Sequence, residues 1–230
     1  MTIGLDIKEV LREVGNTITI IRDSGNITGE YTMFQSNAQV TKPFIREFFL
    51  EGWLSYDTEA VVGDIVEFVV MGDRYIVMNK SPKMLENVIY QYDGVFYKTN
   101  VNCSIYRPVE DEWEEGDYHR VTTWTLVKAN TDVLITSPLY GSDLDADSQI
   151  GKLGIETHEM YVPTSIGVQS LDRIFVSTHV FYEVKTVKPR RYDGVDVLEI
   201  GEDTRTMNST TTTTSTSTTS TSSSTTTTTG

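Results

Sequence analysis

The stretch VVGDIVEFVVMGDRYIVM, residues 61–78, contains two β-rich runs on either side of a turn. Ile65–Val70 and Tyr75–Met78 consist largely of β-branched, aromatic and other apolar residues, and they flank Met71-Gly72-Asp73-Arg74. A Gly-Asp pair between two such runs is typical of a β-hairpin. The stretch therefore predicts antiparallel β structure, and similar runs recur along most of the chain.

The neighbouring segments extend this prediction in both directions. A second hairpin is predicted at Asp93-Gly94, between Val88–Tyr92 and Val95–Thr99. Ile45–Trp53 is apolar and aromatic without a clear period, so it is open between strand and helix. The remaining predicted strands are Thr17–Arg22, Glu30–Phe34, Asn102–Tyr106, His119–Lys128, Asp132–Thr136, His158–Val162, Arg173–Ser177, Phe181–Val187 and Val195–Ile200.

One short amphipathic helix is predicted before the first strand. Its apolar residues recur at helical spacing on one face: Ile7, Val10, Leu11 and Val14. Asp6 is a suitable N-cap, and Gly15 suits the position just past the last turn. Because so short a helix is marginal alone in water, we expect it to pack on the strands as a plug or to dock on a partner.

Composition excludes several functional classes. The chain has 33 acidic and 19 basic residues, a net charge of −14, which disfavours direct binding to DNA, RNA or an anionic membrane. The single cysteine, Cys103, cannot form an internal disulfide. The N-terminus carries charges where a signal peptide needs an apolar run, and no segment approaches the ~20 apolar residues of a membrane span. We therefore expect the chain to fold in a reducing cytoplasm.

Two compositional breaks suggest the domain organisation. Six of the eight residues of Glu110–Asp117 are acidic, and every residue of Ser209–Thr229 is Ser or Thr. Clustered like charge favours an exposed loop, and a Ser/Thr tract lacks the apolar surface to fold alone. The predicted parts are the helix and a first β module (1–108), an acidic linker or loop (109–118), a second β module (119–205) and a low-complexity tail (206–230).

The two halves of the chain share a short internal similarity. Asp64-Ile65-Val66 precedes Tyr75-Ile76-Val77, and Asp172-Arg173-Ile174 precedes Tyr182-Glu183-Val184. Each pair is followed further on by Asp-Gly, at 93–94 and at 193–194. The predicted fold is mainly β, with one or two small β-barrel or sandwich modules, a short N-terminal helix and a disordered Ser/Thr-rich C-terminal tail.

No catalytic, cofactor-binding or metal-binding residue is predicted. The acid-rich loop Gly141–Gly151 does not match an EF-hand. Ser148 and, just past the loop, Gly154 stand where that motif needs Gly and Glu. The three histidines, His119, His158 and His179, lack metal-binding spacing. The sequence contains no GxSxG elbow, no GxGxxG and no GxxxxGK[ST], so we do not expect an enzyme, although a site assembled only in space stays open.

Aromatic residues make up 10% of the chain and permit two interpretations. On an exposed β surface they would form a sugar-binding or protein-binding platform, and otherwise they belong to the core. For Phe48, Phe49 and Trp53 we favour the core or a subunit interface, because so much exposed apolar surface is unfavourable. The residues concerned are Phe44, Phe48, Phe49, Trp53, Tyr90, Tyr92, Phe96 and Tyr97.

The motifs together resemble a known family. The helix and strand at 5–22 (LDIKEVLREVGNTITIIR), the run Val62–Val66 and the run Gly72–Val77 look like the head-closure, stopper or neck proteins of tailed bacteriophages. In the second half, Asp132–Thr136, the loop Gly141–Gly151, Leu171–Ile174 and Tyr182–Val184 resemble the same barrel. The length of this chain and its Ser/Thr tail depart from that family.

The resemblance implies a structural virion protein of the head–tail junction, assembled in the host bacterial cytoplasm. It implies a homo-oligomeric ring that seals the DNA exit channel and mediates tail attachment, with portal or adaptor proteins on one side and the tail terminator or tail tube on the other. Residues 110–117 and 141–151 would then be loops at the channel or interface, where negative charge lets DNA pass without specific binding. The alternative is a carbohydrate-binding or protein-binding β-sandwich with a Ser/Thr-rich stalk.

Overall fold

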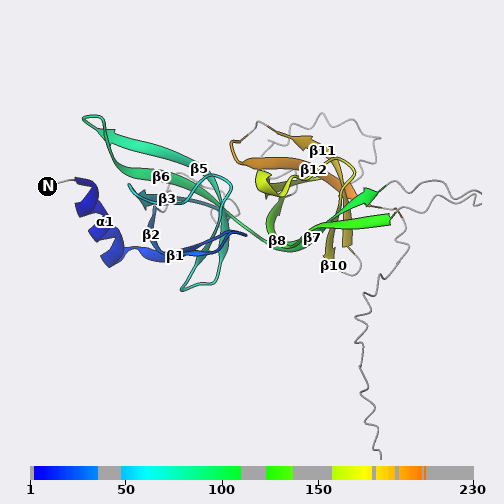
Figure 1. Ribbon diagram of the computed structural model, residues 1–230, viewed down its shortest axis with the longest axis horizontal. Coiled ribbons are helices and arrows are strands. Elements are labelled where there is room, and N and C mark those ends of the chain that lie inside the picture. The colour runs from blue at the N-terminus through cyan, green and yellow to red at the C-terminus, as the bar shows by residue number, and fades with distance from the viewer. Residues whose placement is uncertain are drawn as a thin grey trace, which may run out of the picture.

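The computed structural model describes residues 3–35, 48–109, 123–136, 157–177, 180–189, 192–203 and 205. The fold is mainly β, with one short helix and two closed six-stranded barrels that lie side by side along the long axis (Figure 1). The prediction of β-barrel modules with an N-terminal helix is therefore confirmed, and the number of modules is two. The acidic stretch Glu110–Asp117, the loop Gly141–Gly151 and the Ser/Thr tail lie outside the described residues.

Each barrel is a set of antiparallel strands with one connection across its end. The first contains α1 (Ile3–Val14), β1 (Asn16–Ile21), β2 (Ile27–Gln35), β3 (Phe49–Ser55), β4 (Ile65–Phe68), β5 (Arg74–Leu85) and β6 (Val88–Lys98), in the strand order β1-β2-β3-β6-β5-β4. The second contains β7 (Val101–Val109), β8 (Thr123–Thr136), β9 (Thr157–Pro163), η1 (Thr164–Ile166), β10 (Arg173–Ser177), β11 (Val180–Lys188) and β12 (Val195–Glu202), in the order β10-β11-β12-β9-β8-β7.

The two barrels have the same topology, strand for strand. When β1 is matched with β7, β2 with β8 and so on to β12, the two orders coincide. The irregularities coincide as well: the pairing shifts between Ile18 and Ile20 of β1 and between Cys103 and Ile105 of β7. A matching shift occurs at Val77 in β5 and at Val184 in β11. Shared bulges at equivalent places indicate that the second barrel repeats the first.

The internal similarity of the sequence reflects this repeat in part. Asp64 and Asp172 directly precede β4 and β10, and Tyr75 and Tyr182 occupy equivalent places in β5 and β11. The two Asp-Gly pairs are not equivalent, because the first lies inside β6 and the second precedes β12.

Equivalent strand positions also supply the two cores. The first core contains Ile18, Ile20, Leu54, Ala60, Val66, Phe68, Tyr75, Val77 and Phe96. The second contains Cys103, Ile105, Val133, Met160, Val162, Val168, Ile174, Val184, Leu198 and Ile200. These apolar side chains alternate with outward residues along each strand, as a closed barrel requires. Burial raises the pKa of the Cys103 thiol to about 12, so this cysteine is a core residue and not a nucleophile at neutral pH.

The hairpin predicted at Asp93-Gly94 is wrong. Val88–Lys98 is one continuous strand, and the turn lies earlier, at Glu86 and Asn87, whose φ angles are +48° and +65°. Gly94 serves packing instead, because a Cβ there would stand 2.8 Å from the ring of Phe96 in the core. An Asp-Gly pair therefore marks a close approach here and not a reversal of the chain.

Further boundaries in the structure refine or correct the sequence prediction. The helix begins at Ile3, so Asp6 lies in its first turn and does not cap it. The ambiguous segment 45–53 contains the start of β3, and the predicted strands 119–128 and 132–136 meet in the single strand β8. The first barrel ends with β6 and β7 belongs to the second, so the barrels change over at Thr99 and Asn100, ahead of the acidic stretch.

A third apolar cluster joins the barrels. It combines Ile76 and Met78 of β5 with residues of β8, β9 and β12, and the rings of Tyr97 and Tyr161 meet edge to face at 5.4 Å. An ion pair, Arg74 to Asp132 at 2.6 Å, links the barrels beside this cluster. The buried apolar cluster and this partly exposed ion pair together hold the two barrels against each other.

A close backbone approach between the barrels, at Gly63 and Gly194, allows a test of how they are joined. Gly63 has φ +91°, and a Cβ there would lie 2.2 Å from the carbonyl oxygen of Gly194. Gly63→Ala should therefore destabilise the protein by ~3 kcal/mol or more in urea unfolding, since backbone strain of ~1–2 kcal/mol adds to a clash between backbones.

Gly29→Ala is the matched control for that variant. Gly29 has a similar φ of +84°, but nothing lies within 4 Å of its added Cβ. Gly29→Ala should therefore lower the free energy of unfolding only by the ~1–2 kcal/mol of backbone strain. Equal losses in the two variants would mean that the close approach of the barrels contributes nothing to stability.

Candidate assembly surface

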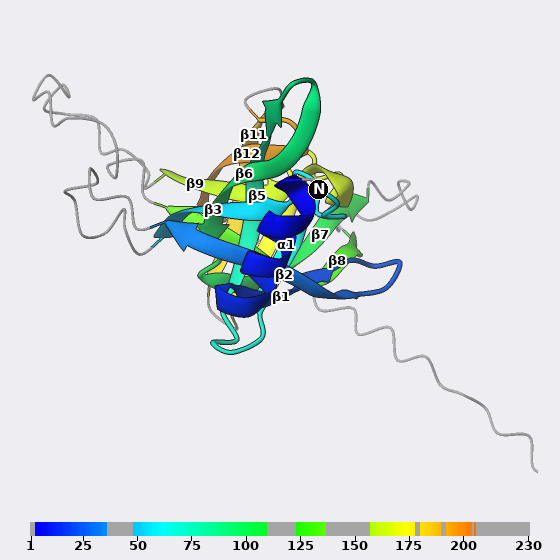
Figure 2. The ribbon, with the colours of Figure 1, turned by 90° about the vertical axis from the view of Figure 1, so that its left-hand side faces the viewer.

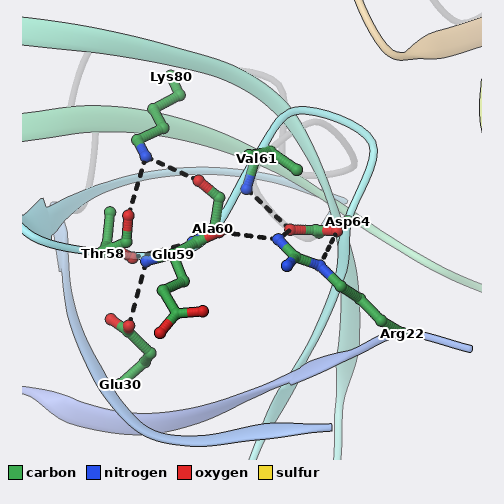
Figure 3. Close-up of polar contacts among 8 residues, drawn as sticks. All are labelled: Arg22, Glu30, Thr58, Glu59, Ala60, Val61, Asp64 and Lys80. Atoms are coloured by element: carbon green, nitrogen blue, oxygen red, sulfur yellow. Dashed lines mark hydrogen bonds and ion pairs between the residues drawn. The ribbon is translucent and has the colours of Figure 1, made fainter. Parts of the chain in front are cut away.

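An arginine–aspartate pair fixes the loop that carries the chain across the end of the first barrel (Figure 3). Arg22, just past β1, donates from Nε to Oδ1 of Asp64 at 2.8 Å and from Nη2 to Oδ2 at 2.5 Å. The same Nη2 donates to the carbonyl oxygen of Glu59 at 2.8 Å, and the N–H of Val61 donates to Asp64 Oδ2 at 2.8 Å. These bonds hold β4 beside β1, where the barrel closes.

The second barrel repeats the pair atom for atom. Arg107 donates from Nε to Oδ1 of Asp172 at 3.0 Å and from Nη2 to Oδ2 at 2.9 Å. Its Nη2 also donates to the carbonyl oxygen of Gly167, and the N–H of Gln169 donates to Asp172. The acceptor and donor lie five and three residues before the aspartate in both barrels. We call these two arrangements the arginine–aspartate clamps.

A lysine braces the first loop from the opposite side. Lys80 of β5 donates to the carbonyl oxygens of Thr58, at 3.2 Å, and Ala60, at 2.8 Å (Figure 3). Its Nζ also lies 4.2 Å from the ring centre of Tyr92. Burial lowers the pKa of Lys80. Glu30 accepts a bond from the N–H of Glu59 at 3.2 Å. The charged groups of this cluster thus bind the backbone of the loop, and they hold the loop in place.

The clamps predict equal effects in the two barrels. Arg22→Met and Arg107→Met should each destabilise the protein by ~2 kcal/mol, because each leaves a largely buried aspartate without its paired charge. Urea unfolding measures both losses, with Arg12→Met on the exposed face of α1 as a control that should change stability by less than ~0.5 kcal/mol. A loss in only one barrel would contradict the equivalence of the clamps.

A second ionic cluster lies in the second barrel. Arg173 is 1% exposed, and its Nε donates to Asp203 at 2.5 Å, while Arg205 donates to the same carboxylate from Nε and Nη2. Both guanidinium groups lie against the ring of Trp124, at 4.2 and 4.9 Å from its centre. The cluster ties the chain just after β12 to the start of β10 and to β8.

The charge of Asp203 makes this cluster sensitive to acid. Burial raises the pKa of Asp203, but the hydrogen bonds from Arg205 and Arg173 outweigh it and lower the pKa to about 2. A folded-state pKa below the ordinary 3.8 means that the stabilisation is complete above pH ~4 and is lost as the pH falls toward 2.

Asp203→Asn tests that dependence. The variant should be less stable than the unaltered protein by ~2 kcal/mol at pH 7, and the difference should shrink as the pH is lowered from 5 to 2. Thermal unfolding at a series of pH values measures it, with Glu13→Gln on the exposed face of α1 as the control. A stability difference that stays constant with pH would mean that the negative charge of Asp203 does not stabilise the fold.

Helix α1 packs across one end of the first barrel by one face only. Leu11 is buried, and Gly4 lies against the ring of Tyr56, where a Cβ would approach to 3.0 Å. Lys8 forms an ion pair with Asp57, and the N–H of Gly15 donates to the carbonyl oxygen of Leu11 at 2.9 Å. The plug that the sequence predicts is thus present, held by the buried face of the helix.

A second face of α1 remains exposed and apolar. Ile3, Ile7, Val10 and Val14 follow one another at spacings of four, three and four residues; we call them the apolar stripe. Ile3, Val10 and Val14 are 47%, 53% and 66% exposed, and Ile7 is half-buried. The sequence assigned Val10 and Val14 to the same face as Leu11, but only Leu11 of these three is covered by the barrel.

The β5–β6 hairpin extends this surface. Its tip exposes Met84, Leu85 and Val88, and a hollow of about 330 Å³ separates the tip from the start of α1. Ile3 and Gly4 line the hollow on one side and Leu85 and Val88 on the other. Figures 1 and 2 show α1 and the hairpin together at the pole of the first barrel, away from the second.

The aromatic residues considered from the sequence lie in several environments, with Tyr90 beside the hollow and Tyr92 packed against the first core. Phe48, Phe49 and Tyr97 pack between the barrels, and Phe96 lies in the first core, so these aromatics do not form an exposed platform. Trp53 is half-exposed, with Lys83 Nζ at 5.9 Å from its ring centre. Outside the described residues lie Phe44, His119, His179 and the loop Gly141–Gly151.

The remaining histidine, His158, packs against an aromatic ring. His158 of β9 is half-buried with its ring edge to face with that of Tyr182, at 5.5 Å. Across the ranges that the structure describes, no three His, Cys, Asp or Glu side chains are grouped to hold a metal ion. Nor does the described part of the chain contain a helix long and apolar enough to cross a bilayer.

Comparisons with known proteins gave one weak structural likeness. No family model matches the sequence, and neither does any curated protein. One solved structure, described as MrkH, a novel c-di-GMP dependence transcription regulatory factor, is 8% identical over 89% of this chain and 85% of that chain, with a TM-score of 0.15. At that TM-score the likeness carries no argument about fold or function.

Proposed function

We propose that this chain is a structural component of the head–tail junction of a tailed bacteriophage. In this role it forms a homo-oligomeric neck or head-closure ring, seals the DNA exit channel and mediates tail attachment. It works by assembly and not by catalysis, with portal or adaptor proteins on one side and the tail terminator or tail tube on the other. The motifs at 5–22, 62–66 and 72–77, which resemble head-closure proteins, support this placement.

One structural observation carries the proposal. Two equivalent barrels are joined by a continuous apolar cluster, and an apolar surface lies exposed at the pole of the first. The first barrel thus contacts the second at one end and exposes an apolar surface to other proteins at the opposite end. This suits a part that links two assemblies.

The charges of the described residues support the same role. The arginines of both clamps and Lys80 are directed at the backbone or carboxylates of their own barrels. The net charge of −14 repels phosphate, so a ring of such chains would let DNA slide through without gripping it.

Mixing the purified protein with the portal complex encoded by the same genome tests the proposal. We expect an added ring at the narrow end of the portal in negative-stain images, and a matching rise in mass by light scattering. Edge and surface contacts buried in such a ring should make assembly cooperative with concentration.

The opposite result is a strict monomer in every mixture, with or without portal complexes, at micromolar concentration. That result would remove the head–tail junction as the site of action. Bound phosphate-rich ligand or nucleic acid at physiological salt would also count against it, because the acidic surface is expected to repel both.

A further inference from the structure

We infer that the α1–hairpin surface, made of the apolar stripe and the hairpin tip Met84, Leu85 and Val88, docks a protein segment whose apolar residues are flanked by lysine or arginine. This inference deepens the proposed function, since it specifies the chemistry of the partner at one end of the chain.

The geometry of α1 gives the first reason. At ~100° per residue the four residues of the apolar stripe lie within roughly 60° of arc. The buried face of the helix, centred on Gly4 and Leu11, is about a quarter-turn away. The stripe is therefore a separate seam with the spacing of a helix–helix contact, and nothing in the described barrel covers Val10 or Val14.

The hollow beside the stripe gives the second reason. Ile3 begins the stripe and also lines the hollow of about 330 Å³, whose opposite wall is the hairpin tip with Val88 62% exposed. This volume is at the lower end of the range for binding cavities, so it accepts one or two apolar side chains of a partner. The stripe and the hollow thus form one continuous apolar surface.

Charge selects among the possible occupants. Asp6, Glu9 and Glu13 are exposed along the outer border of the stripe, and we call them the acidic row. Glu86 at the hairpin turn adds a fourth carboxylate near the hollow. The basic residues of α1 are Arg12, which is exposed, and Lys8, which is paired with Asp57. A partner with lysine or arginine beside its apolar residues complements this pattern, as in interfaces steered by opposite charge.

The same pattern disfavours the other occupants. In an antiparallel symmetric pair of α1 helices the acidic row of one copy would face that of its partner, which is repulsive. The Ser/Thr tract at 209–229 has neither apolar side chains beyond threonine methyls nor positive charge. An anionic membrane or a nucleic acid would be repelled by the acidic row.

A pair of charge-matched variants tests the surface. Val10→Lys/Val14→Lys places two charges in the stripe, and Val69→Lys/Val70→Lys places two at the β4–β5 turn, where the valines are 56% and 82% exposed. All four positions are exposed, so both proteins should fold, which circular dichroism and thermal unfolding check.

The probe is a synthetic amphipathic helix with leucine at the a and d positions and lysine on both flanks. By fluorescence anisotropy the unaltered protein and Val69→Lys/Val70→Lys should bind it equally, and Val10→Lys/Val14→Lys should bind it at least ~10-fold more weakly. The same peptide with glutamate flanks should bind weakly to all three. Equal binding by both variants, or equal binding of both peptides, would overturn the inference.

Two further measurements separate this inference from the proposed function. Sedimentation equilibrium of the protein alone shows whether a second copy is the occupant: self-association abolished by Val10→Lys/Val14→Lys would overturn the inference. Binding to the portal complex that is unaffected by that variant would sink the inference and leave the proposed function standing. Peptide binding through the stripe without any binding to portal complexes would sink the proposed function and leave the inference standing.

Discussion

Each barrel closes where two strands distant in the sequence meet, and an arginine–aspartate clamp holds that closure. In the first barrel β4 reaches β1 only after the chain has crossed the barrel end, and Arg22 binds the aspartate that directly precedes β4. Arg107 and Asp172 do the same for β7 and β10. Since a one-residue slip would exchange the inner and outer faces of a strand, a bidentate bond at the closure also helps to set the register.

The repeat explains both what the barrels share and where they differ. Topology, bulges and clamps coincide, which indicates that these features define the module. The differences lie at the ends: the first barrel has α1 and a long β5–β6 hairpin, and the second has the cluster of Arg173, Asp203 and Arg205. The two copies of one module therefore present different surfaces at their ends.

Charged and apolar side chains are distributed differently in the described barrels. In the described barrels, the clamps and Lys80 direct their charges inward, to loops and carboxylates of their own module. Large apolar side chains face outward on α1 and the β5–β6 hairpin, beside a row of carboxylates. Exposed apolar surface with charged borders is characteristic of surfaces that bind other proteins.

The sequence by itself determined the class of fold, most strands and the short helix, because periodicity and β-branched runs act locally. It also contained evidence of the repeat, because Asp64 and Tyr75 of the first half match Asp172 and Tyr182 of the second. The sequence patterns did not single out Arg22 or Arg107, since each clamp joins residues 42 or 65 positions apart. Only the tertiary structure decided that Asp93-Gly94 continues a strand and that Val10 and Val14 stay exposed while Leu11 is buried, because packing against distant strands overrides local turn and helix patterns.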